Sequence, residues 1–175
     1  MEIIIGPMFS GKSTELLRRA SRYEAIGKNV LYINYYLDQR YGTTNKITTH
    51  NNTSKKALMV QKLNNLLDLD EYKSCDIIAI NEAQFFTDLY DFCITSLYKH
   101  KKYIIMAGLD GDYNKNPFGD ILKLIPHCDK LIKLNALCKI CGNDAKFTKR
   151  ITKNDSQIVI GGEESYIPVC RQHHS

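Results

Sequence analysis

The sequence EIIIGPMFSGKST at residues 2–14 places a short apolar run directly before a glycine-rich loop. Gly6 to Ser13 fit the pattern G-x-x-x-x-G-K-[ST] of a phosphate-binding loop (P-loop). Glu2 to Ile5 are expected to form a buried strand, and apolar residues from Leu16 to Tyr23 recur at helical spacing after the loop. A P-loop requires a strand, a loop and a helix in this order. The stretch therefore predicts an α/β fold that binds the phosphates of a nucleotide.

Each part of this loop suits phosphate binding for a physical reason. The glycines let backbone N–H groups turn toward the phosphates, and the positive end of the following helix faces them. Lys12 is expected to reach the β- and γ-phosphate oxygens, and Ser13 offers a hydroxyl to Mg²⁺. The predicted nucleotide-binding residues of the loop are Gly6, Pro7, Met8, Phe9, Ser10, Gly11, Lys12 and Ser13.

The rest of the chain alternates between apolar strand-like runs and helical patterns. Strands are expected at residues 29–34, 76–80, 103–107 and 131–137, and helical spacing covers residues 58–69 and the segment from Phe85 to Leu97. This alternation is typical of a parallel sheet covered on both faces. The polar stretch 35–56 shows no period and is expected to be a mobile loop. We predict a nucleotide-binding α/β domain at residues 1–135 and a small second module at residues 136–175.

The expected strand at 76–80 ends in Asn81 and Glu82. A carboxylate next to bound phosphates can orient an acceptor hydroxyl and take its proton during phosphoryl transfer. Glu82 is therefore the predicted catalytic base.

Two pairs of metal-ligand residues stand in the predicted second module. Cys138-x-x-Cys141 and Cys170-x-x-His173 each have the two-residue spacing with which a tight turn directs two donors at one ion. Three thiolates and one imidazole fill the tetrahedral shell of Zn²⁺ and leave no position for water, so we predict a structural zinc site. His174 is an alternative ligand. The remaining cysteines are expected to pack as ordinary thiols: Cys75, Cys93 and Cys128.

Length and charge limit the function classes. The chain has 175 residues, with 24 Lys and Arg against 19 Asp and Glu, which suits a single basic globular domain, with or without a small satellite. No run of apolar residues is long enough for a membrane span, and the opening segment lacks a signal peptide's basic region, so a cytoplasmic protein is expected. The basic cluster Lys99 to Lys102 fits a solvated helix end better than a nucleic-acid surface.

Four motifs together resemble the type II thymidine kinases, the class found in cells and poxviruses. They are GPMFSGKST, INEAQFF, LDGDYNKNPFG and the pair CKIC and IVIGGEESYIPVCRQH. The resemblance implies a P-loop (RecA-like) core with a zinc-binding module that carries a lasso loop. It further implies an ATP:thymidine 5′-phosphotransferase of pyrimidine deoxynucleotide salvage, which makes dTMP and accepts deoxyuridine as a second substrate.

The resemblance also assigns residues. It adds Asp38, Gln39, Arg40, Asn81, Glu82, Ala83 and Gln84 to the nucleotide site, and Glu82 matches the family's proton acceptor. The expected thymidine contacts are Phe85, Tyr113, Phe118, Gln157, Ile158, Val159, Ile160, Gly161 and Tyr166. Mg²⁺ with ATP, a structural zinc ion, a homotetramer and feedback inhibition by dTTP are implied as well. The scattered basic residues and the lack of an apolar span make neither a nucleic acid nor a membrane an expected partner. The zinc site would anchor the lasso.

One residue departs from the family pattern. Asn81 stands where the family usually has Asp, so a negative charge facing Mg²⁺ is lost, and we expect weaker Mg²⁺ affinity or slower turnover. Asp110 is the nearest motif carboxylate that could compensate. The alternative hypothesis is a catalytically weakened protein that uses its P-loop and zinc ribbon only to bind a nucleotide or a nucleic acid.

Overall fold

The computed structural model describes residues 1–38, 45–49, 53–153 and 161–174. Its centre is one six-stranded sheet, made of β1 (Glu2–Ile5), β2 (Val30–Tyr35), β5 (Leu58–Val60), β6 (Ile77–Ile80), β7 (Tyr103–Gly108) and β8 (Lys130–Lys133). The strand order is β5-β2-β6-β7-β1-β8, and every neighbouring pair is parallel. The predicted α/β class with a parallel core is confirmed.

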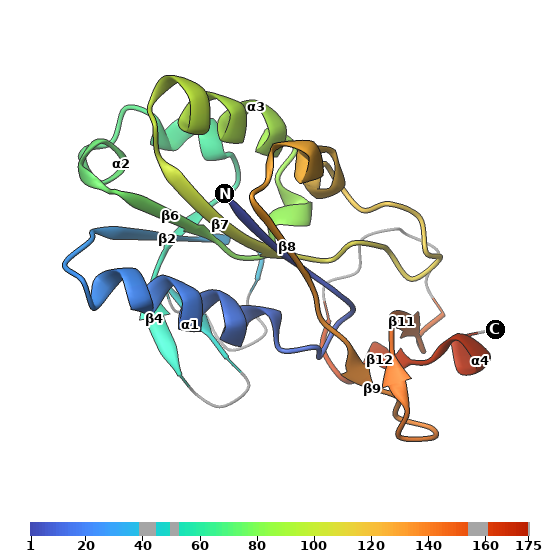
Figure 1. The fold of residues 1–175 in the computed structure, drawn as a ribbon. Helices are drawn as coiled ribbons and strands as arrows, with labels where there is room; N and C mark the ends of the chain where they lie inside the picture. The colour runs from blue at the N-terminus through green and yellow to red at the C-terminus, as the bar shows by residue number, and fades with distance from the viewer. Residues whose placement is uncertain (39–44, 50–52, 154–160, 175) are drawn as a thin grey trace.

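Helices cover both faces of this sheet (Figure 1). Helix α1 (Lys12–Glu24) packs on one face, where its Leu16 and Leu17 join Ile4 of β1. The opposite face receives Ile3 and Ile5 of β1, because successive side chains of a strand point to opposite sides. The elements on that opposite side are η1 (Leu63–Leu66), α2 (Asp70–Ser74), α3 (Leu89–Ile94) and η4 (Ile121–His127). Burial on both faces explains the continuous apolar runs of the strands.

Several element predictions need correction. Residues 58–69 are not one helix, because Leu58–Val60 pairs with the edge of β2 before the short turn η1 begins. The stretch expected to be a loop contains an antiparallel hairpin of β3 (Lys46–Thr48) and β4 (Ser54–Lys56). The helix expected from Phe85 to Leu97 is divided into η2 (Ala83–Phe85), α3 and the π-helical turn η3 (Thr95–Lys99). Sheet and tertiary contacts outweigh weak local periodicity here.

The strand expected at 131–137 also divides. Strand β8 ends at Lys133, and β9 (Ala136–Leu137) pairs with β10 (Asp144–Ala145) outside the large sheet. A second small sheet joins β11 (Phe147–Arg150) to β12 (Tyr166–Val169), and α4 (Arg171–His174) follows. These elements lie together at one end of the molecule (Figure 1). Among the described residues, no helix is long and apolar enough to cross a bilayer.

Candidate active site

The P-loop follows β1 and leads into α1. Gly6 has φ +149°, and a Cβ there would lie 2.4 Å from the carbonyl oxygen of Leu134, so the loop begins at a position that only glycine fits. Gly11 precedes α1 with φ +80°. Lys12 Nζ donates a hydrogen bond to the carbonyl oxygen of Pro7 at 2.6 Å, which bends the side chain back over the loop. The lysine is therefore already held against the cradle in which phosphates are expected.

A chain of side-chain hydrogen bonds leads away from Ser13. Ser13 Oγ donates to Asn81 Oδ1 at 2.9 Å, and Asn81 Nδ2 donates to Asn34 Oδ1 at 3.0 Å. Asn34 Nδ2 in turn donates to Asp38 Oδ2 at 3.1 Å. The order of the sheet explains this chain, because β2 and β6 are neighbours and their carboxyl ends coincide. Asp110 instead pairs with Lys133 Nζ at 2.7 Å, so the carboxylate linked to Ser13 through these amides is Asp38.

Glu82 stands at the carboxyl end of β6 in the left-handed region, with φ 52° and ψ 41°. This conformation is uncommon for a residue with a side chain and is often found at functional sites. Glu82 is 7% exposed and lines a cavity, and Gln84 Nε2 donates a 2.7 Å hydrogen bond to its Oε2. The buried Glu82 carboxylate and the P-loop thus line the same cavity.

This cavity has a volume of about 430 Å³ and continues from the P-loop into an aromatic pocket. Its P-loop side includes Lys12 and Ser13, and the pocket side is formed by Phe85, Leu109, Tyr113, Phe118, Gly161 and Tyr166. Phe85 and Phe118 meet edge to face with ring centroids 5.4 Å apart. Five of the predicted thymidine-contacting residues therefore lie together. Some described residues predicted for the nucleotide site do not line this cavity themselves: Gly6, Pro7, Asn81, Ala83 and Gln84.

Some predicted residues lie outside the described residues: Gln39, Arg40, Gln157, Ile158, Val159 and Ile160. Sequence reasoning in turn missed residues that the fold brings to the pocket. Tyr35 stacks on Phe85 with centroids 5.0 Å apart, and the Arg150 guanidinium lies 3.8 Å from the centre of the Tyr113 ring. Arg150 also donates to the Tyr166 hydroxyl at 2.8 Å. Only tertiary contacts place these side chains, so no local motif could have indicated them.

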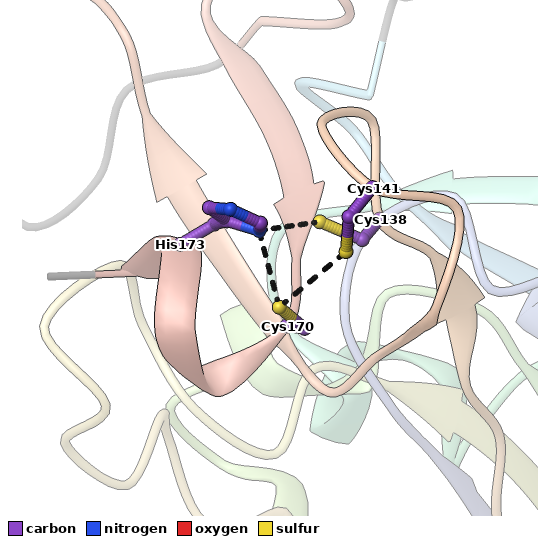
Figure 2. A group of neighbouring side chains, drawn as sticks. All are labelled: Cys138, Cys141, Cys170 and His173. Atoms are coloured by element: carbon purple, nitrogen blue, oxygen red, sulfur yellow. Dashed lines mark hydrogen bonds between the residues drawn. The ribbon is translucent and has the colours of Figure 1, made fainter.

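The predicted zinc ligands gather in one cluster (Figure 2). Sγ of Cys138, Cys141 and Cys170 and a ring nitrogen of His173 all lie within 4.8 Å of one another. Cys141 Sγ is 3.9 Å from Cys170 Sγ, and His173 Nδ1 is 3.3 Å from Cys170 Sγ. Four donors at Zn–S and Zn–N distances of about 2.0 to 2.3 Å from one ion would have such separations, so the donor set fits tetrahedral zinc.

The electrostatics of Cys138 also suit a metal ligand. Burial raises the pKa of its thiol, but backbone hydrogen bonds from Cys170, Ile140 and Cys141 outweigh burial and lower the pKa to about 6. A metal binds the thiolate form. His174, the alternative ligand, points elsewhere: its Nε2 donates to the carbonyl oxygen of Tyr113 at 3.0 Å. His173 is therefore the imidazole of this cluster.

Two further contacts join the cysteine-rich end of the chain to the nucleotide site. The backbone N–H of Met8 in the P-loop donates to Thr148 Oγ1 of β11 at 3.0 Å, and this bond is buried. The hydrogen bond from His174 to the Tyr113 carbonyl oxygen links the same end of the chain to the aromatic pocket. The zinc ligands thus stand next to elements that touch both the P-loop and the pocket.

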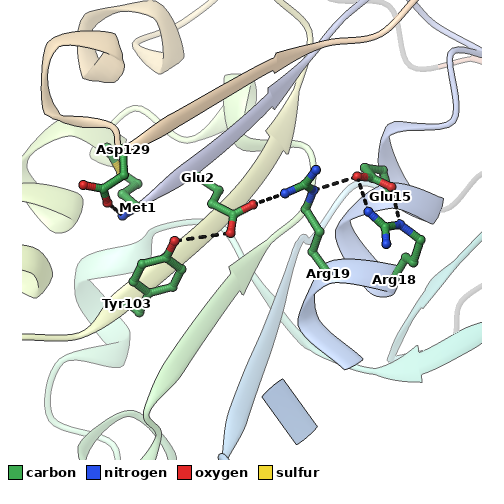
Figure 3. A network of polar contacts seen from close by, with 7 residues as sticks. All are labelled: Met1, Glu2, Glu15, Arg18, Arg19, Tyr103 and Asp129. Atoms are coloured by element: carbon green, nitrogen blue, oxygen red, sulfur yellow. Dashed lines mark hydrogen bonds and ion pairs between the residues drawn. The ribbon is translucent and has the colours of Figure 1, made fainter. Parts of the chain in front are cut away.

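The helix behind the P-loop is fixed to the sheet by a buried ionic network (Figure 3). Arg19 of α1 lies between two carboxylates, paired with Glu2 of β1 and with Glu15, whose Oε1 is 2.6 Å from Arg19 Nε. Tyr103 of β7 donates to the other oxygen of Glu2 at 3.2 Å. Because Arg19 and Glu2 are each 9% exposed, removing Arg19 would leave the Glu2 carboxylate buried without its cation. The network fixes the helix that presents Lys12 and Ser13.

One cavity thus joins a P-loop to an aromatic pocket that suits a planar molecule, and the Glu82 carboxylate lines the same cavity. This arrangement defines a P-loop kinase that acts on a small molecule.

Comparison with known proteins gives the family. A family profile described as thymidine kinase matches residues 1–174. The chain is 42% identical over 178 residues to a thymidine kinase of Oryza sativa subsp. japonica, covering 99% of this chain and 65% of that protein. It is 44% identical over 171 residues to the thymidine kinase of Yaba monkey tumor virus (strain VR587), covering 98% and 92%. It is also 44% identical over 174 residues to that of Choristoneura fumiferana entomopoxvirus, covering 98% and 94%.

The chain belongs to the thymidine kinase family. It spans just under two thirds of the rice relative and more than nine tenths of the two viral relatives. Membership supports phosphorylation of thymidine in nucleotide salvage and does not favour the alternative of a protein that only binds.

Proposed function

We propose that the chain transfers the γ-phosphoryl group of ATP to the 5′-hydroxyl of thymidine, giving dTMP and ADP, with deoxyuridine as a second substrate. The observation that carries the proposal is the single cavity lined by Lys12, Glu82 and the aromatic pocket. A nucleoside whose base lies among the rings would direct its sugar toward the P-loop. Its 5′-hydroxyl would then stand next to the γ-phosphorus.

Glu82 acts as the general base in this proposal. As the 5′-oxygen bonds to the γ-phosphorus, the carboxylate takes the hydroxyl proton, and the bond between the γ-phosphorus and the β,γ-bridging oxygen breaks to release ADP. Lys12 and the backbone N–H groups of the loop neutralise the phosphate oxygens during this transfer. Exclusion of water from the apolar pocket favours transfer to the nucleoside over hydrolysis of ATP.

The residues present also fit the two metals that the family implies. The Ser13 hydroxyl, fixed by Asn81, would bind Mg²⁺, which enters with ATP and supplies charge neutralisation. Cys138, Cys141, Cys170 and His173 would hold a structural zinc ion. The zinc would stabilise the elements that carry Thr148 and His174, and through them the P-loop and the pocket.

The remaining family properties are proposals for this chain. They are a homotetramer, inhibition by dTTP, a cytoplasmic location, a domain boundary near residue 136, and a lasso at residues 157–161 whose main chain reads the base.

Phosphorylation of radiolabelled thymidine by ATP, with Mg²⁺ titrated, tests the main proposal. We expect Glu82→Gln to lower kcat about 10²- to 10⁴-fold, the usual contribution of a general base, with KM for thymidine little changed. Glu71→Gln on the exposed surface of α2 removes the same charge far from the cavity and is the matched control. Full activity of Glu82→Gln would disprove its role as the base, and wild-type protein that forms no dTMP would favour the binding protein instead.

A further inference from the structure

The side chain of Gln84 is held in one orientation by groups whose hydrogen-bonding roles are fixed. The backbone N–H of Leu109 can only donate, and it lies 3.0 Å from one end of the Gln84 amide, so that end is Oε1. The other end is therefore Nε2, which donates to Glu82 Oε2 at 2.7 Å. Gln84 is 3% exposed, so water does not compete for either bond. The amide must point its donor at the carboxylate.

Two glycines leave just enough room for this residue. A Cβ at Gly108, the last residue of β7, would lie 2.7 Å from Gln84 Oε1. A Cβ at Gly119 would lie 2.2 Å from the Gln84 carbonyl oxygen, and Gly119 also has φ +63°. The backbone and the amide of Gln84 are thus confined from two directions. Close packing of this kind keeps a side chain in one rotamer.

We infer that Gln84 is a positioning residue for the catalytic base rather than a ligand of the nucleotide. This inference rests on the role proposed for Glu82. The hydrogen bond restricts rotation of the Glu82 carboxylate, which lines the cavity. A donor on a carboxylate also favours its charged form, which is the form that accepts a proton.

Gln84 further connects the base to the segment that forms the aromatic pocket. Leu109, which donates to Gln84, is the first residue after β7, is 8% exposed and lines the cavity itself. Tyr113 follows four residues later in the same segment. One amide therefore ties the carboxyl ends of β6 and β7 together at the point where base and nucleoside would meet. A small shift of the pocket segment would be transmitted to the carboxylate.

Gln84→Glu separates positioning from structural support. A carboxylate at position 84 can still accept the Leu109 N–H, so the link to β7 is kept, but it faces Glu82 with an acceptor instead of a donor. We expect kcat at neutral pH to fall about 10- to 100-fold, in line with the cost of misplacing a reacting group. KM for ATP and for thymidine should stay within about threefold, since neither substrate loses a contact. The acid limb of the kcat–pH profile should move to higher pH, because two adjacent carboxylates share a proton.

Gln84→Met is the second variant and keeps the test decisive if Gln84→Glu does not fold. It removes both hydrogen bonds without adding a charge, so kcat should again fall and the acid limb should again move to higher pH, by less. Gln61→Glu, an exposed residue between β5 and η1, is the control for the charge change. Glu82→Gln is measured in parallel, so that failure of the base assignment is seen independently.

The outcomes are distinct. A lower kcat with a shifted pH profile supports the inference. Wild-type kinetics in Gln84→Glu overturns the inference, as does wild-type kinetics in Gln84→Met if only that variant folds. In either case Glu82 remains the base if Glu82→Gln is inactive. A raised KM for ATP with unchanged kcat also overturns it, because Gln84 would then contact the nucleotide. An active Glu82→Gln would remove the premise and with it the proposed mechanism.

Discussion

Replacing Asn81 by Asp should destabilise the enzyme when Mg²⁺ is absent, although the two side chains have the same shape. The change replaces the Nδ2 donor by an oxygen at the point where Asn81 meets Asn34 Oδ1, 3.0 Å away. Asn34 cannot turn its amide to help. Its Oδ1 also accepts the backbone N–H of Tyr35 at 3.0 Å, and its Nδ2 donates to Asp38. If the Asn34 amide were flipped, its oxygen would replace Nδ2 opposite the Asp38 carboxylate, and that hydrogen bond would be lost.

The magnitude follows from burial. Asn81 is 3% exposed and Asn34 is 1% exposed, so neither oxygen of the new contact reaches bulk water. A buried group that loses its hydrogen-bond partner costs about 1–3 kcal/mol, and more when it is charged. We expect a loss of about 3 kcal/mol in the free energy of unfolding at pH 7, equivalent to about 150-fold in the unfolding equilibrium.

Urea unfolding at pH 7 measures this cost, in buffer without Mg²⁺ and without chelator, since a chelator would also remove zinc. Asn81→Ala removes the hydrogen bond to Asn34, and also the acceptor of the Ser13 hydroxyl, without adding a charge, and it should cost less, about 1–2 kcal/mol. With ATP present, the new carboxylate should lower the Mg²⁺ concentration that half-saturates activity, because it adds a negative charge near the Ser13 hydroxyl. Asn81→Asp that is as stable as wild type without Mg²⁺ would refute the hydrogen-bond reasoning.

Three further outcomes are expected. Cys138→Ser should lose bound zinc and raise KM for thymidine more than KM for ATP, and a variant with full zinc content and unchanged thymidine KM would contradict the anchoring role. Hydrogen bonds from Arg18 and Arg19 outweigh burial and lower the pKa of Glu15 to about 2. Glu15 therefore contributes stability that is present above its unfolded pKa of about 4.5 and is lost as the pH falls toward 2, so Glu15→Gln should flatten acid unfolding in that window. Gly119→Ala should lower Tm by roughly 4–8 °C, the shift for about 2 kcal/mol in a chain of this length, as scanning calorimetry would show, because its Cβ meets the carbonyl oxygen of Gln84 at 2.2 Å.

Local chemistry explains which parts of the site could be predicted from the sequence. The P-loop and the two ligand pairs of the zinc cluster depend on short spacings in the sequence. The sequence pattern alone therefore predicts how these residues are arranged in space. Glu82 could be predicted because it stands two residues after the last residue of an apolar strand. The weak helical period of residues 58–69 was misleading because a three-residue edge strand carries almost no periodic signal of its own.

The rest of the site depends on which strands become neighbours. Asn34 and Asn81 are 47 residues apart, and nothing in either local sequence indicates that β2 and β6 lie side by side. Arg150 lies beside Tyr113 at the end of β11, a strand that pairs with β12 and not with a neighbour in the sequence of Tyr113. Such contacts need the order of the sheet, which alternation of strands and helices does not determine.

The hydrogen bond from Met8 to Thr148 spans 140 residues, and it has a consequence for biosynthesis. At a synthesis rate of about 5–20 residues per second, roughly 7–28 s pass between translation of the P-loop and translation of its partner. During that interval the backbone N–H of Met8 lacks its acceptor, the Thr148 hydroxyl, and the aromatic pocket lacks Tyr166. Translation must therefore run almost to the end of the described chain before a nucleoside can bind and stabilise the nascent enzyme.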